Sequence, residues 1–196
     1  MKQVAQLAAV LALALFVTAC GNNRQKWQTQ SIAGIMPDLQ FTLTDENGNV
    51  VHADDYRGKV KLMYFGYTHC PDICPLTLAT IGRALKQLGN EADGVRVLFV
   101  SVDPKRDPPQ QLKQYTNAFG PQFVGLTGTQ DQLHALSKRY RVAYGYEKPD
   151  TNGDYIVNHS SAIFVFNDDG NAKLLMSRTD GTDAMAHDLR QLIQGS

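Results

Sequence analysis

The segment Tyr64-Phe65-Gly66-Tyr67-Thr68-His69-Cys70-Pro71-Asp72-Ile73-Cys74-Pro75 joins two different sequence patterns. The apolar run from Lys61 to Tyr67 is typical of a strand buried on both faces, and a helical pattern begins at Leu76. Two cysteines four positions apart stand between these patterns. A strand that brings two thiols to the start of a helix predicts a redox site or a site for a soft metal ion.

The composition predicts one compact domain preceded by a tail. The chain has 196 residues, 43% of them hydrophobic, which is enough for a single core. Its formal net charge is +0, and no basic stripe indicates binding to nucleic acid. Because Cys20 falls in the N-terminal segment, the fold keeps only Cys70 and Cys74. Two thiols this close in sequence are more typical of chemistry than of a disulfide scaffold.

Residues 1–19 have the pattern of a secretory signal peptide. The apolar run from Leu7 to Ala19 would rise about 20 Å as a helix, short of the ~30 Å hydrocarbon core of a membrane. A tilted anchor helix over Val4–Ala19 is the alternative. Val17-Thr18-Ala19-Cys20 resembles the bacterial lipobox, which implies that Cys20 is acylated and becomes the new N-terminus.

Residues 20–33 are largely polar and predict a membrane tether, followed by a folded domain over 34–196. Several acyl chains suffice to hold a soluble domain at a membrane. The expected location is therefore the cell envelope, with the domain lipid-anchored to a bacterial membrane and facing the periplasm.

Hydrophobic periodicity predicts an α/β domain. A β-hairpin over 39–52 is followed by helices and strands in alternation, over 59–67, 76–88, 95–102, 109–119, 123–126 and 129–140. Segments 144–146 and 155–157 flank a polar tongue, and a hairpin over 162–178 precedes a last helix over 182–193. This order predicts a thioredoxin-like fold with an N-terminal β-hairpin and a mixed central sheet. The cysteines then lie at the carboxyl end of a strand, where sites of such folds are found.

The spacing of Cys70 and Cys74 restricts their chemistry. One helical turn separates their Cα atoms by about 6 Å, which permits a disulfide or joint ligation of a metal. Thioredoxin-like oxidoreductases use Cys-x-x-Cys, and the wider spacing favours a chelate for copper(I) or zinc. A closed zinc site needs four ligands, and two further Cys or His are not nearby in the sequence. A cysteine pair without function is the alternative.

A third ligand could come from one of five histidines: His52, His69, His134, His159 and His187. His134 and His187 fall in predicted helices and His52 ends an edge strand, so all three are expected at the surface. His69 adjoins Cys70, but adjacent side chains point apart. His159 precedes the strand over 162–166, and in thioredoxin-like folds this loop crosses over the cysteines. We therefore favour His159, with a loop histidine bonded to the backbone as the alternative.

Three separated motifs resemble the Sco/SenC family, the copper-binding proteins that assemble cytochrome c oxidase. The motifs are Tyr64–Pro75, Ser101-Val102-Asp103-Pro104-Lys105-Arg106-Asp107-Pro108 and Asn158-His159-Ser160, and the likeness covers about Gly34 to Ile193. The resemblance implies that Cys70, Cys74 and His159 bind one copper ion, Cu(I) or Cu(II). It also implies delivery of that ion to the copper-bearing oxidase subunit, and a periplasmic copper donor is a further candidate partner.

Three smaller motifs complete these expectations. An aspartate commonly precedes the histidine in the family, and Asn158 would remove this anionic partner, which bears on affinity more than on the ligand set. Asp103 and Asp107 bracket Arg106 in a turn with a local ion pair, and we do not expect Asp103 to be a ligand. Asp72 is expected to cap the helix that follows it.

Three functions would use these residues. The first is a copper metallochaperone, which is a binding protein rather than an enzyme. The second is a thiol–disulfide oxidoreductase with Cys70 and Cys74 as its redox pair, which keeps the copper-ligand cysteines of the oxidase reduced. A thiol peroxidase is the weakest, because its motif has threonine three residues before the cysteine and Thr68 is two before Cys70. A dithiol reductant does not need His159, which separates the first two functions.

Overall fold

The computed structural model describes residues 26–195; Cys20 and the predicted signal peptide lie outside them. The strands are β1 (Gln30–Ser31), β2 (Thr42–Asp45), β3 (Val50–His52), β4 (Val60–Gly66), β5 (Val95–Ser101), β6 (Phe123–Thr127), β7 (Tyr144–Tyr146), β8 (Val157–His159), β9 (Ile163–Phe166) and β10 (Ala172–Met176). The α-helices are α2 (Ile73–Leu88), α3 (Pro109–Asn117), α4 (Gln130–Arg139) and α5 (Thr182–Gln194), and 3-10 turns are η2 (Ala53–Tyr56), η3 (Gly89–Gly94) and η4 (Arg178–Asp180). Within 26–195, no helix is long and apolar enough to cross a membrane.

A mixed sheet organises the domain. In the described residues it has 8 strands in the order β1-β10-β9-β4-β5-β6-β2-β3, while β7 and β8 form a separate two-stranded ribbon. Strands β4, β5 and β6 are parallel, and the other neighbours are antiparallel. Every residue of β4 is buried, as expected for a central strand covered on both faces. The predicted thioredoxin-like fold, with the β2–β3 hairpin at one edge, is confirmed.

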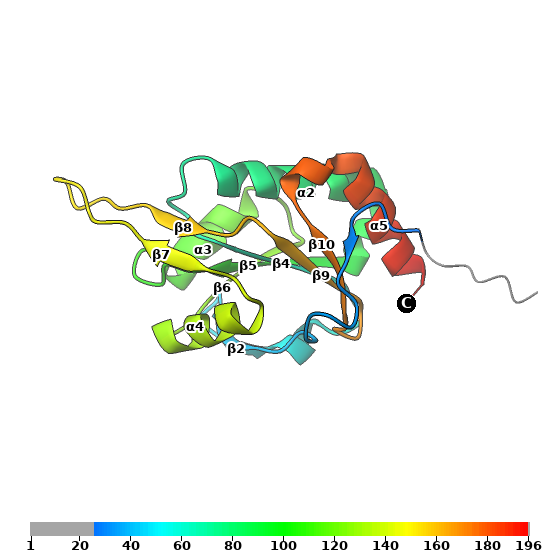
Figure 1. The fold of residues 1–196 in the computed structure, drawn as a ribbon, viewed down its shortest axis with the longest axis horizontal. Helices are drawn as coiled ribbons and strands as arrows, with labels where there is room; N and C mark the ends of the chain where they lie inside the picture. The colour runs from blue at the N-terminus through cyan, green and yellow to red at the C-terminus, as the bar shows by residue number, and fades with distance from the viewer. Residues whose placement is uncertain (1–25, 196) are drawn as a thin grey trace, which may run out of the picture.

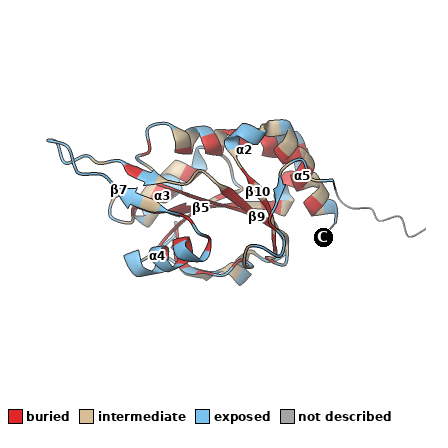
Figure 2. Cartoon of the chain, in the orientation of Figure 1, coloured by how far each residue is buried: buried red, intermediate tan, exposed pale blue. Residues whose placement is uncertain are grey.

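Helices cover both faces of this sheet (Figure 1). Helices α2 and α5 lie side by side on one face, and α4 lies on the opposite face. Tyr115 of α3 packs against Phe99 of β5, whose ring also contacts Tyr64 of β4. At the end of α4, Tyr140 packs against Phe164 and Phe166 of β9 on the other side. Figure 2 shows the buried residues concentrated in the central strands and the inward sides of the helices.

The first described residues lie against the domain, although the sequence predicts a tether there. Trp27 packs on the core, and β1 adds a strand to the edge of β10. The fully buried carboxylate of Asp188 in α5 accepts hydrogen bonds from the backbone N–H groups of Gln28 and Thr29, at 3.0 and 2.9 Å. The polar pattern of residues 27–31 does not indicate these contacts, because the residues that they meet lie more than a hundred positions later in the chain.

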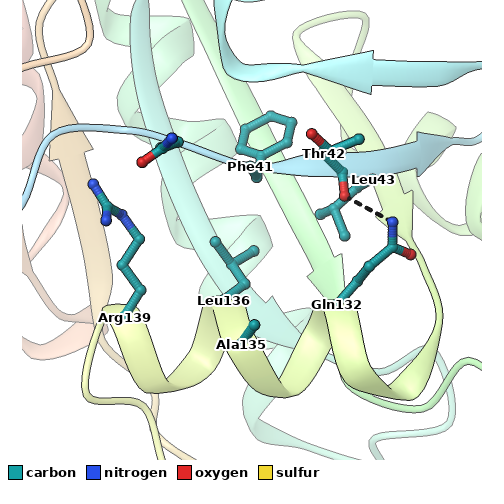
Figure 3. Close-up of a pocket in the computed structure, with 8 residues that line it drawn as sticks. Phe41, Thr42, Leu43, Gln132, Ala135, Leu136 and Arg139 are labelled. Atoms are coloured by element: carbon teal, nitrogen blue, oxygen red, sulfur yellow. Dashed lines mark hydrogen bonds between the residues drawn. The ribbon is translucent and has the colours of Figure 1, made fainter.

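A pocket of about 270 Å³ lies between α4 and the segment that leads into β2 (Figure 3). Phe41, Leu43 and Leu136 line it, and Gln132 donates a hydrogen bond to the carbonyl of Thr42 across it. It contains none of the predicted site residues.

Candidate metal site

The cysteine pair lies where β4 ends and α2 begins. Helix α2 starts at Ile73, earlier than predicted, so Cys74 is in its first turn, where Pro75 is tolerated because these amides lack helical partners. Asp72 holds the N-cap position, but its side chain makes no capping hydrogen bond, in contrast to the prediction. The Sγ atom of Cys70 instead accepts from the backbone N–H of Cys74, at 3.4 Å. Both cysteines are free thiols and buried.

Gly66, the last residue of β4, makes room for Cys74. A Cβ atom at position 66 would lie 2.9 Å from Cys74 Sγ and 2.6 Å from Phe99 Cε2. Contacts this short do not occur between real side-chain atoms, so another residue at position 66 would displace the sulfur or the ring. The glycine therefore lets the sulfur lie directly over the end of the strand.

His159 approaches the cysteines from the β7–β8 ribbon. It pairs with Tyr144 at the end of the ribbon, and its Nε2 atom lies 3.2 Å from Cys74 Sγ. Its Nδ1 atom lies 2.9 Å from the carbonyl oxygen of Ser160, a pure acceptor. The hydrogen of the neutral ring therefore belongs on Nδ1, which leaves the Nε2 lone pair facing the sulfurs. This is the tautomer that a ligating histidine needs.

Two aromatic rings hold the imidazole from its sides. The rings of Tyr64 and Tyr67 lie 6.0 and 5.9 Å from the His159 ring, both edge-on. Both tyrosines are buried, in or directly after β4. They restrict the His159 ring on the side of the sheet and exclude water there.

The two thiols differ in acidity. A hydrogen bond from the Cys74 thiol lowers the pKa of Cys70 to about 5 against the opposing effect of burial, with help from the backbone N–H groups of Asp72 and Cys74. The contact with Cys70, together with burial, raises the pKa of Cys74 well above its usual value. Cys70 is therefore the thiolate of the pair, and Cys74 is the thiol that stabilises it.

The donor atoms of Cys70, Cys74 and His159 lie within 4.8 Å of one another and could hold a metal ion. Cys70 and His159 line a pocket of about 250 Å³, together with Pro71, Ile156 and Asn158. Two sulfurs and one imidazole nitrogen suit copper in either oxidation state. The residues therefore fit the ion that the sequence predicts as cargo, and the assignment of these three residues as its ligands stays a prediction.

The other histidines do not join this cluster. His52 and His134 are exposed, and His187 is at hydrogen-bond distance from Asp188. In the described residues, the group of donor atoms that could hold a metal ion contains His159 and none of these three. The Nδ1 atom of His69 lies 3.1 Å from Thr68 Oγ1 and 3.8 Å from a carboxylate oxygen of Asp107.

Asn158 turns away from the imidazole. Its amide donates to the carboxylate of Glu147 at 2.9 Å, because successive residues of a strand point to opposite sides. The partner of His159 Nδ1 is the backbone of Ser160. Any effect of Asn158 on copper affinity therefore acts indirectly, through the β7–β8 ribbon, because its side chain does not contact the His159 imidazole.

Sequence reasoning missed several residues that shape the site. Gly66 is needed for space, Tyr67 contacts the imidazole, and Arg106 lies 5.6 Å from the centroid of the Tyr67 ring. Tyr67 and Arg106 both fall within the quoted motifs, which was the available signal. Tyr155 lies outside those motifs, and no pattern around it indicated a role at the site.

Known proteins resemble this chain in sequence and in fold. The SCO1/SenC family model matches residues 33–194. Protein SCO2 homolog, mitochondrial, of Bos taurus is 36% identical over 171 residues, which cover 86% of this chain and 64% of that protein. The chain thus matches somewhat less than two thirds of that relative's length.

Solved structures agree with this match. Copper-bound ScoI of Bradyrhizobium japonicum is 36% identical, with a TM-score of 0.73, and the match covers 80% of this chain and 99% of that one. Copper-bound yeast Sco1 is 30% identical, with a TM-score of 0.74 and coverage of 82% and 90%. Since the family model spans nearly all of the described chain and these structures share its fold, the chain belongs to the SCO1/SenC family.

Proposed function

We propose that this protein is a copper metallochaperone, which binds one copper ion through Cys70, Cys74 and His159 and passes it to the copper-bearing subunit of cytochrome c oxidase. The observation that carries the proposal is the convergence of the three donor atoms within 4.8 Å. BsSco, a protein of similar fold, is a member of the Sco family of cytochrome c oxidase assembly proteins. The similar structures of Bradyrhizobium japonicum ScoI and yeast Sco1 contain copper.

The side chains are arranged to receive and to release a soft ion. Cys70 offers a thiolate at neutral pH because its pKa is lowered to about 5. Cys74 gives up its proton on ligation, and His159 offers Nε2 while the Ser160 carbonyl holds Nδ1–H. Copper(I) is the cargo that two thiolates favour, and the imidazole extends the donor set toward copper(II). Cys70 adjoins the pocket, which leaves it accessible to an incoming ligand from a partner.

We further propose that Cys20 carries the lipid and that the domain faces the periplasm from a bacterial membrane. The resemblance of residues 17–20 to a lipobox supports this location. The described chain begins beside α5, at the end of the molecule opposite the β7–β8 ribbon (Figure 1). A domain tethered there would present its metal site away from the membrane, toward a copper donor or the oxidase subunit.

The unequal thiols favour a second candidate function, reduction of a partner's disulfide. The Cys70 thiolate would attack one sulfur of that disulfide, form a mixed disulfide and release one partner thiolate. Cys74 would then lose its proton and attack Cys70 Sγ, which releases the second partner thiol. The products are a Cys70–Cys74 disulfide and a partner dithiol, a transfer of two electrons.

Replacement of His159 separates the two functions. We expect His159→Ala to weaken copper binding about tenfold or more, since one of three ligands is lost. Thiol–disulfide exchange of the same variant should change little, because the thiols remain. The measurement is a copper titration of the reduced full chain against a competing chelator, beside the exchange rate with a small disulfide. An unchanged copper affinity would overturn the metallochaperone and leave the reductase.

A further inference from the structure

The turn between β5 and α3 contacts both halves of the candidate metal site. We propose that residues 103–107 form a positioning element that fixes the cysteine loop and the histidine strand relative to each other, with Arg106 as the residue that holds the strand. This inference rests on the proposed function, because it concerns the same three donor atoms. The contacts of Asp107 and Arg106 carry it.

Asp107 holds the loop that leads to the cysteines. Its side chain is fully buried and accepts from the backbone N–H of Thr68 at 3.0 Å and from the Thr68 hydroxyl at 2.6 Å. The Ser101 hydroxyl donates to the same carboxylate at 2.6 Å and accepts from the backbone N–H of Asp103. Thr68 is two residues before Cys70, so this carboxylate fixes the path by which the loop reaches the first thiol.

Arg106 holds the ribbon that carries His159. Its guanidinium group donates to the carbonyl oxygen of Tyr155 at 3.0 Å and lies 3.5 Å from the centroid of the Tyr155 ring. Asp103 completes the contact, since its carboxylate accepts from Arg106 and, at 2.9 Å, from the Tyr155 hydroxyl. A backbone hydrogen bond, an ion pair and a cation–π contact thus meet four residues before His159.

The ribbon needs such contacts because β7 and β8 form their own two-stranded sheet, which projects beyond the main sheet (Figure 1). An isolated two-stranded ribbon is at best marginally stable and relies on its attachments. The Tyr146 hydroxyl, which donates to the carbonyl of Val102, supplies a second attachment. Arg106 reaches further than Tyr146, because it also lies 5.6 Å from the ring of Tyr67, which contacts the imidazole.

Arg106 therefore stands between Tyr155 and Tyr67, and each of these tyrosines leads to His159. Removing the guanidinium would free the ribbon at Tyr155 and the ring at Tyr67 together. The imidazole would then occupy a wider range of positions relative to the sulfurs, while the thiols themselves would stay in place. A site held less closely binds its ion less tightly, and loss of such a supporting contact typically weakens metal affinity about 10-fold or more.

The test compares Arg106→Met with Arg106→Lys and with Arg139→Met in the reduced full chain. Arg139 is a matched control, because it also lies over a tyrosine, at 5.9 Å from the Tyr140 ring, and donates to a backbone carbonyl, that of Asp38, at 3.0 Å. We expect about tenfold weaker copper binding for Arg106→Met, a smaller loss for Arg106→Lys and none for Arg139→Met. The copper(II) form should also show an altered nitrogen coupling in its electron paramagnetic resonance spectrum.

A measurement without copper keeps this inference separate from the proposed function. In the copper-free wild type, nuclear Overhauser contacts should join the His159 ring to the rings of Tyr64 and Tyr67. Arg106→Met should lose them and keep the contacts around Cys74. Retention of these contacts in Arg106→Met overturns the positioning role. A wild type that binds no copper overturns the proposed function, and the ring contacts still decide the role of Arg106.

A second variant covers the case in which Arg106→Met does not fold. Tyr155→Phe keeps the ring and removes only the hydroxyl that donates to Asp103. It should shift copper affinity and the ring contacts in the same direction, by less. Unchanged ring contacts in both Tyr155→Phe and Arg106→Lys would contradict the inference.

Discussion

Cys74 Sγ lies 3.2 Å from His159 Nε2, although 85 residues separate the two in the chain. One atom belongs to the first turn of a helix at the core, and the other to a ribbon outside the main sheet. An ion bound between them would therefore tie the ribbon to the core.

Copper should stabilise the folded chain for this reason. A ligand at about 100 times its Kd adds roughly 2.7 kcal/mol to the free energy of unfolding, which corresponds to about 5–10 °C in Tm for a domain of this size. Thermal unfolding of the reduced chain without copper and with free copper(I) buffered at about 100 times its Kd measures this. Cys70→Ser and Cys74→Ser should lose both the shift and stoichiometric binding. A stoichiometric complex in either serine variant would show that the thiols do not share one site.

Alkylation should distinguish the two cysteines. Because the pKa of Cys70 is lowered to about 5, its thiolate predominates above that pH, and its rate should change little between about pH 8 and 6 and fall as the pH drops through about 5. Cys74, whose pKa is raised, should stay unmodified. Peptide mapping after timed iodoacetamide treatment gives both rates. A Cys70 rate that rises tenfold per pH unit from 6 to 8 would contradict the lowered pKa.

Gly66→Ala should disturb the site through its sulfur. The new Cβ would lie 2.9 Å from Cys74 Sγ, and overpacking of this kind costs about 1–3 kcal/mol. Copper affinity should fall with stability, because the displaced atom is a proposed ligand. Gly145→Ala is the control, since a Cβ at that position meets nothing within 4 Å. Chemical denaturation and copper titration of both variants measure these effects. Equal losses of stability and copper affinity in Gly66→Ala and Gly145→Ala would refute the steric explanation.

Asp188→Asn should loosen the N-terminal residues. Burial alone would raise the pKa of Asp188, but hydrogen bonds from the Gln28 backbone, His187 and Thr29 outweigh it and hold that pKa below its usual value. The carboxylate therefore contributes stability above about pH 4 that is lost as the pH falls through the folded-state pKa.

The expected loss for Asp188→Asn is about 2–3 kcal/mol at pH 7, since hydrogen bonds to a buried charge are weakened. It should shrink as the pH falls below about 4, because the carboxylate of the unfolded chain then takes up a proton while the folded carboxylate, whose pKa is lowered, resists protonation. Urea unfolding at pH 7 and at pH 3 measures this, and Asp183→Asn, an exposed acid on the same helix, is the control. A loss that grows toward acid would contradict the assigned pKa direction.

Cys20→Ser tests the proposed location. Without the thiol there is no acyl acceptor, and two or more chains are needed for stable membrane binding. The variant should move from the membrane to the soluble fraction and lose incorporation of labelled fatty acid. Retention of the label would exclude Cys20 as the modified residue.

The fold class could be predicted from the sequence, because it depends on local patterns. The period-two hairpin at 39–52, the buried run at 60–66 and the helical spacing after Leu76 are each visible within one short stretch of the sequence. The spacing of Cys70 and Cys74 likewise indicated a metal or redox site. His159 was selected from its place before a predicted strand and from the family motif.

The geometry of the site could not be predicted, because it rests on contacts between distant residues that leave no periodic pattern. Nothing local reveals that Asp107 bonds Thr68, that Arg106 contacts Tyr155, or that Asp188 holds the start of the domain. The direction of Asn158 followed from strand pairing rather than from residue type. The chain thus carries its chemistry in short motifs, while packing of the ribbon and the turn against β4 sets the distances on which metal binding depends.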